Sequence, residues 1–153
     1  MNPDKEYRIW SLVSQKYLVL TKNGDNTPTV DCTGTGQEQS GVISLTRNTK
    51  SAIPGEVSYH FKFRADDGTE YVLQVDKQTT PATIYLQPFT EADSTTSAFV
   101  PESFMINSGP FKALKVGNSA KCIASSKDGH LSLKSWKLDN PHPESIFVVS
   151  EID

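Results

Sequence analysis

Three strand-like segments recur along the chain at nearly even spacing. They are Tyr17–Leu20, Tyr71–Val75 and Cys122–Ser125, and they begin 54 and then 51 residues apart. Each segment follows an extended apolar stretch and precedes a turn and a further strand. A regular internal repeat indicates an architecture built from copies of one supersecondary unit. The sequence therefore predicts three structural repeats, over residues 5–50, 57–108 and 109–153.

Each repeat is expected to contain four short strands. Helix signals are nearly absent, while nine glycines and nine prolines divide the chain into short segments that alternate with period two. The expected strands are Tyr7–Leu12, Tyr17–Thr21, Thr29–Cys32, Gly41–Arg47, Ser58–Arg64, Glu70–Asp76, Ala82–Gln87, Glu102–Asn107, Phe111–Val116, Lys121–Ser125, His130–Ser135 and Ser145–Ser150.

Turn signals support the same division. Asn23–Asn26, Asp66–Gly68 and Lys127–Gly129 each supply residues that tolerate a positive φ. Pro28 and Pro81 stand at matching places, just before the third strand of their repeats. A proline is acceptable there because the first residue of a strand need not donate to the ladder.

Four strands in each of three repeats predict an all-β protein, a β-trefoil. This fold is a six-stranded barrel with pseudo-threefold symmetry, capped by three hairpins, and its closure removes exposed sheet edges. A β-sandwich is the alternative, and it would not require threefold similarity. The 153 residues are expected to form one domain, residues 1–153. The longest insertion, Pro88–Pro101, is polar and is expected to be a surface loop.

Charge and composition exclude several classes of protein. The net charge is −3, and no basic stripe suggests a nucleic-acid partner. No apolar run approaches 18 residues, so no membrane insertion is expected. The polar start Met1–Glu6 does not resemble a secretory signal, which predicts a leaderless cytoplasmic protein, with non-classical release as the alternative. Cys32 and Cys122 are interpreted as small buried thiols.

The motifs of common enzymes are missing. The three histidines do not have helical metal-site spacing, and there is no Cys-x-x-Cys or Gly-x-Ser-x-Gly. Gly34 and Gly36 lack the third glycine and the helix of a phosphate cradle. The pair Asp66-Asp67 is interpreted as a turn. We therefore expect no enzyme, no metal and no cofactor, but recognition by loops on a rigid scaffold.

The third repeat contains the strongest candidate for a ligand site. Alternation places Leu131 and Leu133 on the core face of their strand and His130 and Trp136 on the opposite face. An indole ring is a flat platform for the apolar face of a sugar, and nearby polar groups hydrogen-bond to hydroxyls. The predicted ligand-binding residues are Asp128, His130, Trp136, Asn140 and His142. The alternative is that Trp136, at the strand end, caps the barrel rim.

A second candidate surface is the loop from Lys22 to Pro28. If it is extended and stiffened by Pro28, such a loop suits a protease cleft, because rigidity lowers the entropy cost of binding. The residues of this alternative site are Asn23, Asp25 and Asn26. An ordinary turn is the competing interpretation.

Parts of the sequence resemble known families. The segment Lys16–Val30, with Tyr7 and Ile9, resembles the first repeat of mushroom β-trefoil lectins. Pro81–Pro88, followed by Val100–Ile106, is similar to mycocypins, the mushroom cysteine-protease inhibitors. These resemblances imply a leaderless, non-catalytic defence protein whose partner is a glycan or a protease. The Gln-x-Trp signature of ricin-B-type lectins is absent, and Gln37–Ile43 occupies the equivalent strand.

Interleukin-1-type cytokines are a third resemblance. Arg8-Ile9-Trp10, Ile123–Lys127 and the ending Ser145–Val149 look like segments of these cytokines, which would imply a receptor as the partner. The chain departs from them at Ala113–Lys121, where their aromatic residues and proline are missing. The three functional hypotheses are thus a fungal-type lectin, a loop-based protease inhibitor and a receptor-binding cytokine.

Overall fold

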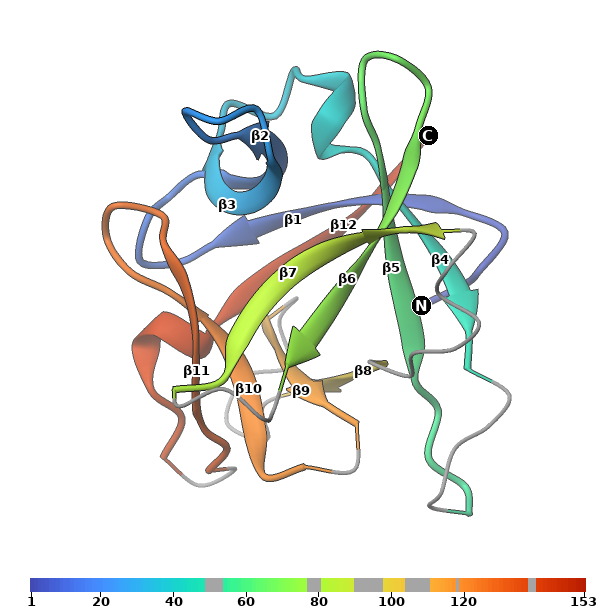
Figure 1. The fold of residues 1–153 in the computed structure, drawn as a ribbon. Helices are drawn as coiled ribbons and strands as arrows, with labels where there is room; N and C mark the ends of the chain where they lie inside the picture. The colour runs from blue at the N-terminus through green and yellow to red at the C-terminus, as the bar shows by residue number, and fades with distance from the viewer. Residues whose placement is uncertain (49–53, 77–80, 90–97, 104–110, 118, 138–139) are drawn as a thin grey trace.

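Twelve β-strands form the regular structure of the described residues in a computed structural model (Figure 1). The structure describes residues 1–48, 54–76, 81–89, 98–103, 111–117, 119–137 and 140–153. The strands are β1 (Glu6–Ser11), β2 (Tyr17–Lys22), β3 (Pro28–Gly34), β4 (Ile43–Arg47), β5 (Tyr59–Arg64), β6 (Glu70–Asp76), β7 (Thr83–Pro88), β8 (Phe99–Ser103), β9 (Phe111–Val116), β10 (Lys121–Ser125), β11 (Leu131–Ser135) and β12 (Phe147–Ile152). The prediction of an all-β protein with twelve strands is confirmed.

Six of these strands close into a barrel. β1 pairs with β4, β4 with β5, β5 with β8, β8 with β9, β9 with β12, and β12 returns to β1, all antiparallel. The closing pair runs in register from Glu6 opposite Ile152 to Ser11 opposite Phe147. Because the ring is complete, each barrel strand has a neighbour on both sides.

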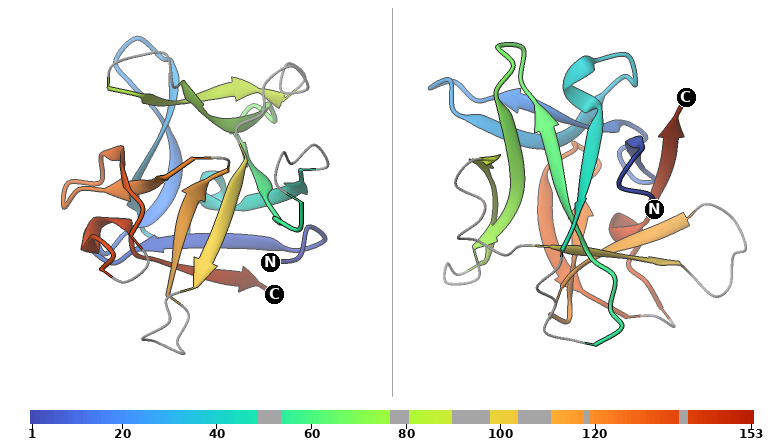
Figure 2. Two further views of the ribbon diagram at one scale, coloured as in Figure 1. Left: turned by 90° about the horizontal axis from the view of Figure 1, so that it is seen from below. Right: turned by 90° about the vertical axis from the view of Figure 1, so that its right-hand side faces the viewer.

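The other six strands form three hairpins, which Figure 2 shows from two further directions. β2 pairs with β3, β6 with β7 and β10 with β11. The second strands of these hairpins, β3, β7 and β11, each pair with one neighbour within the described residues. They also contact one another, so the three hairpins meet and their outer strands surround a common space.

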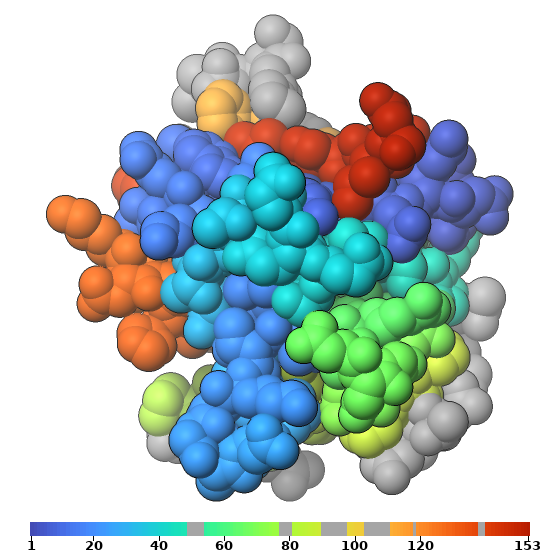
Figure 3. All heavy atoms as spheres, turned by 90° about the horizontal axis from the view of Figure 1, so that it is seen from above, coloured from blue at the N-terminus to red at the C-terminus, as the bar shows by residue number. Residues whose placement is uncertain are grey.

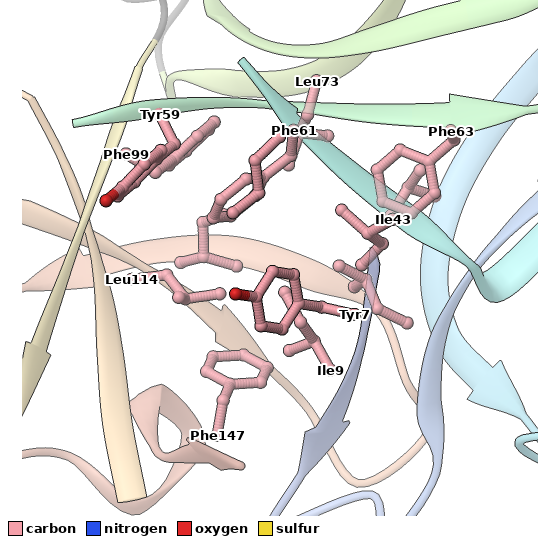
Figure 4. Close-up of a cluster of buried hydrophobic side chains, with 14 of the residues drawn as sticks. Tyr7, Ile9, Ile43, Tyr59, Phe61, Phe63, Leu73, Phe99, Leu114 and Phe147 are labelled. Atoms are coloured by element: carbon pink, nitrogen blue, oxygen red, sulfur yellow. The ribbon is translucent and has the colours of Figure 1, made fainter. Parts of the chain in front are cut away.

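The barrel interior is filled by large apolar side chains from all three repeats (Figure 4). Phe61, Phe99 and Phe147 are fully buried, and the rings of Phe61 and Phe99 stack with centroids 5.0 Å apart. Burying each such side chain stabilises the folded state by about 1.5–3 kcal/mol. Alternation explains the pattern, because in β1 the side chains of Tyr7 and Ile9 point inward at every second position.

The prediction for the eighth strand is wrong. The sequence predicted a strand at Glu102–Asn107 and a surface loop at Pro88–Pro101, but β8 runs from Phe99 to Ser103. Ala98, Phe99 and Val100 are buried. Residues 104–107 lie outside the described residues. Pro101 was interpreted as the end of a loop, whereas it lies within β8 opposite Leu114. A proline lacks only the N–H donor, so it does not exclude a strand.

Two other strands begin later than predicted. The predicted strands Gly41–Arg47 and Ser145–Ser150 correspond to β4 and β12, each of which starts two residues further along. A 3-10 helix precedes each of them: η1 (Gln39–Gly41) before β4 and η3 (Pro143–Ser145) before β12. The local i→i+3 bonds of these turns use backbone groups that the predicted strands would have placed in the ladder.

The hairpin turns confirm the predicted turn chemistry. Asn26 and Gly129 have φ values of 69° and 91° in the β2–β3 and β10–β11 turns, and Gly68 has a φ of 88° in the β5–β6 turn. Pro28 is the first residue of β3, as predicted. A left-handed backbone therefore occurs in all three of these turns, with asparagine or glycine where it is least strained.

Candidate functional site

The predicted sugar-binding residues lie at the two ends of β11. Asp128 and His130 belong to the turn before β11, while Trp136, Asn140 and His142 follow it. At about 3.3 Å per residue, His130 and Trp136 are about 20 Å apart along the strand. The structure therefore divides the predicted residues into two groups and does not bring them into one site.

β11 itself alternates as predicted. Leu131 and Leu133 are half-buried and pack against the core, while His130 and Ser132 are exposed. Trp136 is half-buried, and its backbone N–H donates to the Ala120 carbonyl over 2.7 Å. Trp136 thus lies at the base of the β10–β11 hairpin, where part of its surface is covered.

His142 has a structural contact of its own. Its Nδ1 accepts a hydrogen bond of 3.2 Å from the Glu144 backbone N–H, which caps the start of η3. The Glu144 carboxylate lies 3.8 Å from the Lys134 ammonium. One of the two ring nitrogens of His142 is therefore used inside the protein, while Asn140 is exposed.

The loop proposed for protease binding is a closed turn and not an extended segment. Asn23 Oδ1 and Asp25 Oδ1 both accept from the Thr27 backbone N–H, at 3.0 and 3.1 Å. The Asn26 N–H donates to the Asn23 carbonyl over 2.9 Å. Hydrogen bonds from the Thr27 hydroxyl and then from the Thr27 backbone N–H lower the pKa of Asp25. The turn folds back on itself because Asn26 adopts a positive φ.

One predicted site residue of each candidate surface lines a common groove, while Asp25, Asn26, Asp128, Trp136, Asn140 and His142 are not in its lining. A cavity of about 370 Å³ lies between the β2–β3 hairpin, β7 and the β10–β11 turn, and both Asn23 and His130 line it. Figure 3 shows the three segments, in blue, yellow-green and orange, around a notch in the outline of the molecule. Its polar lining consists of Thr21, Lys22, Asn23, Thr29, Asp31 and His130.

Each hairpin supplies one aliphatic side chain to the groove. Val30 comes from β3, Ile84 from β7 and Leu131 from β11. All three also contact the hydrophobic core, so the apolar part of the groove is continuous with the interior. A cavity that combines an apolar base with a few polar groups is the usual form of a small-molecule site.

The polar groups on the β2–β3 hairpin lie on one face. Thr21 pairs directly with Thr29, and Asp31 is two residues further along β3. The Asp31 carboxylate accepts a hydrogen bond of 2.5 Å from the Thr33 hydroxyl. The Asn23 amide oxygen accepts from the Thr27 N–H, and the NH2 group of the same amide supplies two N–H donors. The groove therefore presents both donors and an anionic acceptor.

A backbone hydrogen bond holds the third hairpin against the first. The Cys32 N–H donates to the Gly129 carbonyl over 2.8 Å. Cys32 follows Asp31 in the chain and Gly129 precedes His130, so this bond keeps the two groove residues near each other. A Cβ on Gly129 would lie 2.6 Å from the Cys32 carbonyl oxygen, which explains the glycine at this contact.

Both cysteines are buried free thiols, as predicted. Burial raises the pKa of Cys32 to about 12. It also raises the pKa of Cys122, whose thiol donates to the Ser145 hydroxyl over 3.3 Å. Neither thiol is ionised near neutral pH, and only the thiolate is strongly nucleophilic or metal-binding.

Sequence reasoning missed Thr21, Thr29 and Asp31. A signal was present, because Thr29, Asp31 and Thr33 alternate with the apolar Val30 and Cys32. Such a row of polar residues indicates the solvent-facing side of a strand, and most rows of this kind bind nothing. Only the contact with the neighbouring hairpins distinguishes this one.

Comparisons with known proteins indicate the fold. Neither a protein-family model nor a curated protein sequence matches the chain. The crystal structure of Cry35Ab1 matches with a TM-score of 0.68 and 13% sequence identity, over 100% of this chain and 37% of that one. At this identity the likeness concerns the fold alone. Membership of the mushroom lectin, mycocypin or cytokine families stays a prediction.

The described residues contain neither a metal-ligand cluster nor a membrane-spanning helix. Among them there is no group of three or more histidine, cysteine, aspartate or glutamate residues arranged to hold a metal ion. The same part of the chain contains no helix that is long and apolar enough to cross a membrane.

Proposed function

We propose that the chain is a β-trefoil that binds carbohydrate, without catalysis, in the groove between its three hairpins. The fold proposal is supported by the pairing of six strands into a closed barrel and of the other six into three hairpins, one from each repeat. The likeness to Cry35Ab1 over the whole chain agrees with it.

The lining of the groove is the observation that carries the functional proposal. A sugar ring combines apolar C–H groups with hydroxyls that both donate and accept. Val30, Ile84 and Leu131 provide apolar contact, while Asn23, Asp31 and His130 provide hydrogen-bonding partners at the groove edge. Each such hydrogen bond contributes about 1 kcal/mol, so a single sugar is expected to bind with a millimolar Kd. A longer or multivalent glycan gains affinity through avidity.

The experiment is a glycan array, followed by calorimetric titration of the glycans that bind. Asn23→Ala and His130→Ala are each expected to raise the Kd about fivefold, because each removes one hydrogen-bonding group. Lys127→Ala is the matched control, since Lys127 is exposed on the same turn as His130 but does not line the groove. This control is expected to bind as the wild type does.

The variant Trp136→Ala separates this proposal from the sugar platform predicted from the sequence. Binding in the groove leaves the affinity of a folded Trp136→Ala variant unchanged, whereas a platform at the base of the β10–β11 hairpin requires the indole. Circular dichroism checks that the variant is folded. An array without any bound glycan, or a loss of binding in Trp136→Ala alone, would contradict the proposal.

A further inference from the structure

The Asp31 carboxylate is the anionic group of the groove lining. It is half-buried in the groove lining, and the Thr33 hydroxyl donates to one of its oxygens. An ionised carboxylate has about four acceptor positions and no donor. A ligand that enters the groove displaces water from this group, so it must bring donors of its own or leave the charge poorly solvated.

The groups around Asp31 complement one particular arrangement of ligand atoms. The Asn23 side chain has two amide N–H donors, while its oxygen accepts from the Thr27 N–H. Thr21 and Thr29 place hydroxyls beside each other on the same hairpin face. Two adjacent hydroxyls of a sugar donate together to one carboxylate. The donors of Thr29, Thr21 and Asn23 follow one another along the hairpin, where they face other hydroxyls of the ligand.

Lys22 is a cation that also lines the groove, and the carboxylate of Asp67 is an acidic neighbour of it. The pKa of Asp67, on the β5–β6 turn, lies below its usual value, first because the Thr69 backbone N–H donates to it over 2.9 Å and also because Lys22 is near. A ligand carboxylate would therefore meet a lysine that already has an acidic neighbour, and it would also meet the like charge of Asp31.

We infer that the groove selects neutral sugars through a pair of adjacent hydroxyls that donate to Asp31, and that it rejects acidic sugars. The inference rests on the proposed function and names the class of sugar that this same groove takes. Asp31 then sets the specificity, because its carboxylate accepts hydrogen bonds from donors of the ligand and repels anionic groups of the ligand.

The test compares matched neutral and acidic sugars. Methyl glycosides of the gluco, galacto and manno series, and the corresponding methyl uronosides, are titrated into ¹⁵N-labelled protein up to about 50 mM, well above a millimolar Kd. The backbone amide signals of Asp31 and His130 report binding at the groove. In the series that binds, the neutral glycoside is expected to have a Kd about tenfold lower than its uronoside. Replacing one of the two adjacent hydroxyls by hydrogen is expected to raise the Kd about tenfold.

Asp31→Asn removes the charge while it keeps the shape of the side chain. This variant is expected to bind the neutral glycoside about tenfold more weakly and to lower the ratio of the two Kd values to below about threefold. Asp66→Asn is the matched control, because it makes the same change on an exposed turn outside the groove lining. It is expected to leave the ratio unchanged.

The outcomes distinguish the inference from the function on which it rests. If no sugar shifts the groove signals, the proposed function fails and the inference fails with it. If neutral glycosides bind but uronosides bind equally well or better, the proposed function stands and the inference is wrong. The same conclusion follows if Asp31→Asn binds both sugars as the wild type does.

Discussion

Gly129 and Gly68 have nearly the same backbone conformation but different surroundings. Their φ values are 91° and 88°, so an alanine at either position pays for a left-handed backbone. A Cβ on Gly68 would meet nothing within 4 Å, whereas one on Gly129 would lie 2.6 Å from the Cys32 carbonyl oxygen. A comparison of alanine substitutions at the two positions therefore separates the free-energy cost of the left-handed backbone from the cost of the steric clash.

We expect Gly68→Ala to lower the free energy of unfolding by about 1 kcal/mol and Gly129→Ala by about 2–4 kcal/mol. The difference arises because the Cys32 backbone must shift in the second variant. Urea denaturation of the two variants and the wild type measures both values. Equal losses in the two variants would show that the Gly129 contact does not constrain the β10–β11 turn.

Glu38 makes the stability of the protein depend on pH in the acidic range. Its pKa is lowered to about 2, chiefly because the Thr35 backbone N–H donates to the carboxylate at 2.9 Å; the Gly36 N–H adds a bond of 3.1 Å. A carboxyl group with a depressed pKa stabilises the fold above its unfolded pKa, near 4.3. That contribution is lost as the pH falls through about 2.

We expect Glu38→Gln to lower the free energy of unfolding by about 1 kcal/mol at pH 7, a modest value because the carboxylate is partly exposed and screened. The difference from the wild type is expected to shrink below about pH 4.3 and to disappear near pH 2. Denaturation curves at several pH values test this. A difference that is constant with pH would contradict the role of the Glu38 charge.

The sequence predicted individual residues of the groove but not that they lie close together. His130 was predicted from its strand alternation and Asn23 from its loop, in two separate arguments. Their proximity depends on the hydrogen bond from Cys32 to Gly129, two groups 97 residues apart in the chain. Local pattern carries no information about such a contact, because it is made by the packing of one hairpin on another.

At the scale of the elements, β8 shows why one strand was misplaced. The strand was predicted too late in the chain because Phe104-Met105-Ile106 is more apolar than the residues before it. In the structure, however, Phe99 is buried in the barrel interior and stacks on Phe61. Strand pairing decides the register here, since Phe99 lies opposite both Tyr59 and Val116. The other strands were predicted to within two residues or so because their alternation and their turns agree.

We expect Phe99→Ala to lower the free energy of unfolding by about 3–5 kcal/mol, since it leaves a cavity beside Phe61 in the barrel. Val57→Ala is the matched control: Val57 is 40% exposed, whereas Phe99 is 0% exposed. The control is expected to change the free energy by less than about 0.5 kcal/mol. Urea denaturation measures both variants, and a Phe99→Ala variant as stable as the control would place β8 elsewhere.

At the scale of the whole molecule, the first and last strands complete the barrel together. β1 and β12 pair over six residues of each strand, so repeats one and three are joined directly by backbone hydrogen bonds. The threefold recurrence in the sequence was enough to predict twelve strands, because each repeat carries its own turns and alternation. Ile9, Phe61 and Phe147 are buried together in the interior that this ring encloses.

The hydrogen bond between Cys32 and Gly129 affects the width of the groove, and with it the size of ligand that the groove prefers. It joins the chain neighbours of Asp31 and His130, so it sets the aperture between the two walls from a point that a ligand does not touch. A substitution in the β10–β11 turn that lengthens this bond moves His130 away from the opposite wall, and it does so without replacing any residue of the lining. Discrimination between large and small ligands can therefore be retuned through the scaffold alone.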